Sequence, residues 1–77
     1  MNVRIKFFGL LAEVAKISEL VLPGVKDTDA MREKIISDFP ELKNQSFVVA
    51  VNKKVITGNQ LLDQGDEIAL LPPFAGG

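Results

Sequence analysis

The sequence of 77 residues contains no cysteine, histidine, tryptophan or tyrosine. Without cysteine the chain forms no disulfide, and without cysteine and histidine it lacks the usual ligands of zinc and haem. Domains this small bury a modest share of their surface, and many are supplemented by a cross-link, a metal or a partner. We therefore expect a single domain over residues 1–77 that depends on its own packing or on another protein.

The missing residue types also restrict the chemistry. No histidine can activate a serine or cysteine nucleophile, and no imidazole can serve as an acid or base near neutral pH. The net charge is −1, and aromatic residues make up 6% of the chain, so neither the charge nor the stacking surface for nucleic-acid binding is present. The sequence shows no membrane span and no signal peptide. We expect a cytoplasmic protein that is not a self-contained enzyme.

Period-two patterns and apolar runs predict the strands. In residues 2–8 apolar and charged side chains alternate, which places Phe7 inward and Phe8 outward. The near-continuous apolar run 47–51 is typical of a central strand that is buried on both faces. Further strands are expected at residues 19–22 and 67–71, with a short one at 55–56.

The clearest helix follows Asp27, whose side chain is a suitable N-cap. Met31, Ile35 and Phe39 repeat every four residues, as on one face of a helix. Pro40 ends it, because the residue before a proline avoids helical geometry. Shorter helical turns are predicted over residues 10–15, with Leu11 and Val14 inward, and over residues 59–62.

The predicted order is strand, strand, helix, strand, short strand, strand. Strands on both sides of one substantial helix indicate an α+β domain in which that helix lies across one face of a mixed sheet. This is the β-grasp, or ubiquitin-like, arrangement. The ferredoxin-like alternative requires a second long helix before the last strand, and the sequence offers none.

Asp63, Asp66 and Glu67 form a local concentration of acidic side chains just before the last strand. Paired carboxylates can bind a metal, but aspartates beside a glycine such as Gly65 are more typical of a turn. We therefore predict a turn here and no metal site.

The C-terminal tail, residues 72–77, is the most informative feature. Pro72 and Pro73 hold the chain extended after the last strand, and the sequence finishes on Gly76 and Gly77. Six extended residues at about 3.3 Å each reach roughly 20 Å. A terminal glycine carboxylate has no Cβ beside it, so it can enter a narrow tunnel. Once a partner with ATP has converted it to an acyl-adenylate, it can accept sulfur or a lysine amine. The plain alternative is a frayed chain end.

Three apolar side chains occupy positions where polar ones are expected. Phe8 shares the outward face of the first strand, Val55 follows a lysine-rich turn, and Leu71 is out of register with its inward neighbours. If they gather near the root of the tail, they form a docking patch for a partner. Alternatively, Phe8 and Leu71 cover a small second core.

Residues 63–77, DQGDEIALLPPFAGG, resemble the C-terminal signature of the molybdopterin synthase small subunit family, typically D-G-D-E-V-A-x-x-P-P-V-x-G-G. Residues 3–8, 27–39 and 50–52 fit the same family pattern, so the resemblance covers essentially the whole chain. It departs at Gln64, where glycine is common, and at Phe74, where valine or a similar residue is common.

The resemblance implies a sulfur carrier that binds no cofactor itself. In that family an adenylating enzyme of the ubiquitin-activating type uses ATP on the terminal glycine, here Gly77, and a sulfur donor protein then converts it to a thiocarboxylate. The large synthase subunit receives the tail and transfers the sulfur to precursor Z, with two small and two large subunits in the assembly. The residues expected at that interface are Phe8, Val55, Leu71, Pro72, Pro73, Phe74 and Ala75, with Gly76 preceding the reactive Gly77.

Two other functions stay open. The sulfur carrier of thiazole (thiamine) biosynthesis shares the fold and the Gly-Gly end, but it is usually shorter and lacks the Pro-Pro pair. A ubiquitin-like modifier joined to lysines of other proteins is chemically compatible with the same tail.

Overall fold

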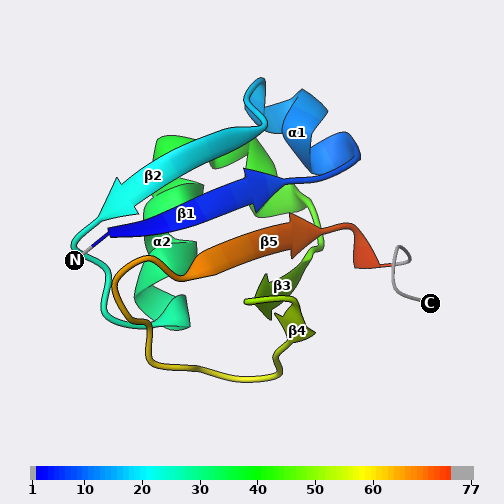
Figure 1. The fold of residues 1–77 in the computed structure, drawn as a ribbon. Helices are drawn as coiled ribbons and strands as arrows, with labels where there is room; N and C mark the ends of the chain where they lie inside the picture. Colours follow the sequence, from blue (N-terminus) through cyan, green and yellow to red (C-terminus); the bar gives the residue numbers. More distant parts are fainter. Residues whose placement is uncertain (1, 74–77) are drawn as a thin grey trace.

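The computed structural model describes residues 2–73. They form a five-stranded sheet with the order β2-β1-β5-β3-β4, and the longer helix packs across one face of it (Figure 1). In chain order the elements are β1 (Asn2–Phe7), α1 (Leu10–Ala15), β2 (Glu19–Pro23), α2 (Thr28–Asp38), the 3₁₀ helix η1 (Pro40–Asn44), β3 (Val48–Val51), β4 (Lys54–Val55) and β5 (Glu67–Leu71).

The sheet is mixed, with β5 at its centre. β5 runs parallel to β1 on one side and antiparallel to β3 on the other, while β2 and β4 form the edges. With α2 across one face, this is the predicted β-grasp fold. Within residues 2–73, no helix is long and apolar enough to cross a membrane.

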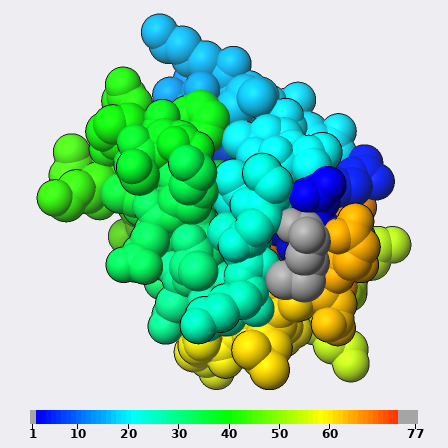
Figure 2. Space-filling view, turned by 90° about the vertical axis from the view of Figure 1, so that its left-hand side faces the viewer, coloured from blue at the N-terminus to red at the C-terminus, as the bar shows by residue number. Residues whose placement is uncertain are grey.

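The core lies between the sheet and α2. Alternate residues of the central strands point toward the helix, and Ile5, Ile68 and Leu70 have no exposed surface. Met31 and Ile35 of α2 are equally buried in the same cluster. Figure 2 shows the two layers from the side, with the helix layer in green and strands β2 and β5 in cyan and orange. The domain therefore depends on apolar packing, in line with its lack of cross-links.

Helix α2 begins and ends where the sequence predicts. The Asp27 carboxylate accepts a hydrogen bond from the backbone N–H of Ala30 at 2.8 Å, which satisfies one free donor of the first turn. This hydrogen bond also lowers the pKa of Asp27 below its ordinary value. At the other end the ring of Phe39 meets Phe7 of β1 edge-on, with 5.6 Å between ring centroids. The helix is thus capped at its start and anchored to the sheet at its end.

Two helical features differ from the expectations. The sequence did not predict η1, which begins at Pro40 and buries Leu42 completely. In α1 the predicted burial of Leu11 is confirmed, but the second buried residue is Ala15, and Val14 is only half-buried.

The predicted helical turn over residues 59–62 is wrong. This segment runs along the start of α2, where the N–H of Thr28 donates to the carbonyl of Gln60 and the N–H of Leu62 donates to the carbonyl of Lys26, each at 2.9 Å. Leu61 forms an isolated bridge with Asp27. These long-range hydrogen bonds take the place of the local ones that a helical turn would make.

The third and fourth strands also need correction. β3 is not central, because it lies next to the edge strand β4, and it begins at Val48. It is nevertheless buried on both faces from Val49 onward, as predicted. The hairpin turns at Asn52 and Lys53, whose φ angles of 49° and 72° are both left-handed, so β4 already begins at Lys54.

Candidate functional site

The face of the sheet that α2 leaves uncovered divides into an apolar and a charged half. Figure 1 looks onto this open face, with α2 behind the strands. We define the docking face as the apolar half. It comprises outward side chains of β5, β3 and β4 together with the residue after β1: Phe8, Val48, Ala50, Val55, Ala69 and Leu71.

The strand register makes the docking face continuous. Leu71 pairs with Val48, while Ala50 pairs with Ala69 on one side and with Val55 on the other. The N–H of Phe8 donates to the carbonyl of Leu70 at 3.1 Å, which continues the β1–β5 pairing past Phe7 and brings Phe8 beside Leu71.

Apart from Ala50, which is buried, the side chains of the docking face are more exposed than those of the core. Phe8 is 44% and Val55 is 61% exposed, and Leu71 is partly exposed. None of these three side chains belongs to the core cluster or packs against it within the described residues. Phe8 and Leu71 therefore do not contribute to the main core, and the alternative of a second core stays a prediction. Exposed apolar side chains gathered in this way are typical of a contact surface for another protein.

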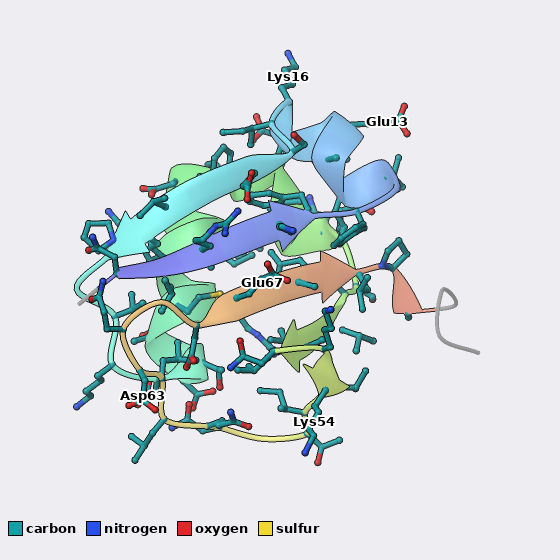
Figure 3. The ribbon with its side chains drawn as sticks, in the orientation of Figure 1. Glu13, Lys16, Lys54, Asp63 and Glu67 are labelled. Carbon is teal, nitrogen blue, oxygen red and sulfur yellow. The ribbon has the colours of Figure 1, made fainter. Side chains whose placement is uncertain are left out.

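The charged half of the open face lies toward β2. Arg4 of β1 donates to Glu19 of β2 at 2.6 Å, and Lys6 pairs with Glu67 of β5 at 3.3 Å. The hydrogen bond between Arg4 and Glu19 raises the pKa of the guanidinium and lowers the pKa of the carboxyl. Figure 3 shows Glu67 on the open side of β5. The Arg4–Glu19 pair is exposed and the Lys6–Glu67 pair is half-buried, so solvent screens both, and they mark the boundary of the apolar half.

The root of the tail rests on Gly9. This glycine follows Phe8 with φ 57° and ψ −135°, a conformation that side-chain-bearing residues rarely adopt. A Cβ at Gly9 would lie 3.1 Å from Cγ of Pro72. A side chain at this position would therefore displace the Pro72 ring by a few tenths of an ångström, at the point where the chain leaves β5. Pro72 is half-buried and Pro73 is exposed, while Phe74, Ala75, Gly76 and Gly77 lie outside the described residues.

The acidic residues before β5 serve the turn. Asp66 accepts hydrogen bonds from the backbone N–H of Asp63 at 2.8 Å and from the side-chain amide of Asn52 at 2.9 Å. Glu67 faces Lys6 instead of the other two carboxylates. Among residues 2–73 there is no group of three or more carboxylate, histidine or cysteine side chains that could hold a metal.

The described part of the chain has no buried acid or base. Thr28 is the one buried polar residue among residues 2–73, and its hydroxyl is satisfied by Asn59 and by the backbone N–H of Gln60. The arrangement thus offers a contact surface and a fixed point of departure for the tail. It does not offer an assembled catalytic centre within residues 2–73.

Sequence reasoning predicted the outward side chains Phe8, Val55 and Leu71 but missed the contact at the start of the tail. Alternation along β1 and β5 was enough to turn Phe8 and Leu71 outward. The contact between Gly9 and Pro72 joins two distant parts of the chain. The one sequence signal for this contact was the glycine that follows the first strand, and a glycine there is equally typical of an ordinary strand end.

Comparison with known proteins assigns nearly the whole chain to one family. The model of the ThiS family matches residues 5–77. This chain belongs to the ThiS family. Among its relatives is a molybdopterin synthase sulfur carrier subunit of Chlamydomonas reinhardtii, which is 29% identical over 83 aligned residues and is covered, like this chain, over its full length.

Solved structures of similar proteins agree with this family membership. One of them is a chain in the complex of subunits 1 and 2 of the molybdopterin-converting factor from Helicobacter pylori. It is 31% identical to this chain, with full coverage of both chains and a TM-score of 0.75. The small archaeal modifier protein 1 from Methanosarcina acetivorans is 27% identical, with 99% of this chain and 96% of that chain covered and a TM-score of 0.83. This member of the ThiS family therefore shares its fold with a chain of a molybdopterin-converting factor and with a small archaeal modifier protein.

Proposed function

We propose that this chain is the sulfur carrier subunit of a molybdopterin synthase. The observation that carries the proposal is the full-length match, at 31% identity, to a chain in the Helicobacter pylori complex of molybdopterin-converting factor subunits 1 and 2. The relatives named molybdopterin synthase sulfur carrier subunit, and the Gly76-Gly77 end of this chain, support it.

The reactive group in this proposal is the terminal carboxylate of Gly77. A partner enzyme of the ubiquitin-activating type supplies ATP, the carboxylate oxygen attacks the α-phosphorus, and pyrophosphate leaves. A donor protein supplies sulfur at the sulfide level, as hydrosulfide, which attacks the acyl-adenylate carbonyl; AMP leaves and the proton passes to solvent, which gives a thiocarboxylate. This chain binds no cofactor of its own, and the sulfur passes on to precursor Z. We place these steps in the cytoplasm, where ATP is available.

The docking face is the surface that we assign to the large subunit. Phe8, Val55 and Leu71 are its exposed and half-exposed apolar side chains. Phe8 and Leu71 lie at the end of β5 from which the tail departs, and Val55 lies on β4 at the level of Ala69. A partner that covers them is therefore positioned to receive Pro72, Pro73, Phe74 and Ala75 and then Gly76 and Gly77. We expect two small subunits to flank a pair of large ones.

The proposal is tested by the mass of the protein isolated from its own cells. A carrier is heavier than the bare chain by the difference between one sulfur and one oxygen atom, and the change maps to the C-terminal peptide. Deletion of Gly77 should abolish both this mass change and sulfur transfer, with circular dichroism and melting temperature unchanged. Glu33→Ala, at an exposed position of α2, is the matched control. Normal sulfur transfer by the truncated chain would contradict the proposal.

A second candidate function, protein modification, rests on the 27% identity to a small archaeal modifier protein. The same mass spectra distinguish it, because a modifier appears as adducts in which its C-terminal glycine is joined to lysines of other proteins. A carrier for thiazole synthesis is distinguished by the large subunit that purifies with the chain.

A further inference from the structure

A groove lies on the helix side of the molecule, away from the docking face. It is formed by α2, by η1 and by the segment that leads into β3, and it encloses about 360 Å³. Its lining includes the partly exposed apolar side chains of Ile36 and Phe47 and the exposed cationic side chains of Arg32 and Lys43. None of its lining residues is acidic.

The charge of the groove is opposite to that of the whole chain. The protein carries a net charge of −1, yet this surface presents two cations. The ion pairs among residues 2–73 join Arg4 to Glu19, Lys6 to Glu67 and Lys34 to Asp38, so Arg32 and Lys43 have no carboxylate partner within that part of the chain. A negatively charged ligand would supply the missing ion-pair partner for Arg32 and for Lys43.

Arg32 also lies close to an aromatic ring. The carbon of its guanidinium lies 5.4 Å from the centroid of the Phe47 ring, within the range of a cation–π contact. A guanidinium that contacts a ring face can keep N–H donors at its edge free. Those donors match the two oxygens of a carboxylate, which they can bind in a bidentate manner.

We propose that this groove binds an acidic segment of a partner protein. The segment places an aspartate or glutamate carboxylate on Arg32 and Lys43, and an adjacent aliphatic side chain on Ile36 and Phe47. This goes beyond the proposed sulfur-carrier function, which uses the other side of the sheet. Phe47 lies next to Val48, the partner of Leu71, so the groove opens at the same end of the sheet as the tail but on the opposite face. A protein bound there leaves the docking face free.

The test uses the isotope-labelled full-length chain and two synthetic hexapeptides. One peptide alternates glutamate and leucine, and the other alternates glutamine and leucine. The acidic peptide should shift the amide signals of Arg32 and of residues 42–47 in a saturable way, and raising the salt from about 50 to about 300 mM should weaken binding several-fold. Arg32→Gln and Lys43→Gln should each weaken it by about fivefold or more. Lys26→Gln, which changes the same charge at an exposed position outside the groove, should not.

Several results would overturn the proposal. One is that the glutamine peptide binds as tightly as the acidic peptide. Another is that the acidic peptide binds the Arg32→Gln chain as tightly as the parent chain. A third is that the amide shifts map to the docking face instead of the groove. Equivalent shifts on addition of inorganic phosphate alone would show a general anion site, and shifts that depend on protein concentration without peptide would show a second copy of the chain in the groove. Thiocarboxylate formation by Arg32→Gln should equal that of the parent chain, so failure of this proposal and failure of the sulfur-carrier proposal are distinguishable.

Discussion

Two properties of Gly9, its backbone conformation and its contact with Pro72, can be tested by substitution. Its φ of 57° disfavours any side chain, and its missing Cβ makes room for Pro72. Gly24 has a similar φ of 76° but no atom within 4 Å of the position that a Cβ would occupy. A side chain at Gly24 would meet an unfavourable positive φ but no neighbouring atom, whereas a side chain at Gly9 would meet a positive φ and also displace Pro72.

Gly24→Ala should destabilise the fold by about 1 kcal/mol through the left-handed backbone alone. Gly9→Ala should destabilise it more, and it should also shift the amide signals around Pro72, because the ring must move by a few tenths of an ångström. Denaturant unfolding and NMR spectra of the two variants check this. Equal destabilisation, with the signals around Pro72 unmoved, would show that Gly9 does not position the tail.

Asp27 makes the stability of α2 dependent on pH. The hydrogen bond from the N–H of Ala30 lowers its pKa in the folded protein, so the ionised form favours folding. That contribution is complete above the unfolded-state pKa of about 3.9 and is lost as the pH falls through the lower folded-state value. Asp27→Ala should therefore lower the melting temperature near neutral pH, and the difference from the parent chain should shrink in acid. A constant difference across this range would mean that the cap does not act through its charge.

At the scale of the elements, Asn52 connects the β3–β4 hairpin to the start of β5. Its side chain donates to Asp66 at 2.9 Å and accepts from the N–H of Glu67 at 3.0 Å, while its own N–H donates to the carbonyl of Glu67 at 2.8 Å. Asparagine also tolerates the left-handed φ of 49° that the turn requires. One residue thus fixes both the turn and the entry into the central strand.

Asn52→Ala should destabilise the domain by about 1–3 kcal/mol, because two side-chain hydrogen bonds are lost and alanine resists the left-handed φ. Asn52→Gly loses the same hydrogen bonds but keeps the φ, so it separates the two causes. Chemical denaturation of both variants measures the difference. A stability of Asn52→Ala equal to that of the parent chain would show that the backbone hydrogen bond alone holds the hairpin.

The sequence predicted those elements whose signals are local. Asp27, the spacing of Met31 and Ile35, and Pro40 together define α2, since capping, periodicity and termination all act within a few residues. The segment 59–62 was predicted wrongly because its structure is set by hydrogen bonds to the distant start of α2. The central position of β5 was likewise not readable from its own residues, because strand order is a property of the whole chain.

The candidate site divides in the same way. The outward direction of Phe8 and Leu71 followed from alternation, whereas the seat of Pro72 on Gly9 needed the three-dimensional structure. Phe74, Ala75, Gly76 and Gly77 were identified from the sequence, and they lie outside the described residues.

At the scale of the whole molecule, the docking face should dominate binding to the large subunit. Phe8→Ala and Leu71→Ala should each weaken the complex by about 1–3 kcal/mol, because each removes an apolar anchor from the contact. Val21→Ala is the matched control: Val21 is 59% exposed on the same open face, but it lies on β2 in the charged half. Calorimetric titration of the folded variants checks this, and unchanged affinity for both Phe8→Ala and Leu71→Ala would remove the docking face from the interface.

The central position of β5 has a mechanical consequence. Its neighbours β1 and β3 hydrogen-bond to it along both sides, so a pull on the chain beyond Leu71 acts along the strand direction. Such a load shears two ladders at once, and their hydrogen bonds share the force instead of opening one after another. A partner that pulls on the end of this chain therefore loads β5, the strand that is hydrogen-bonded to a neighbour on each side.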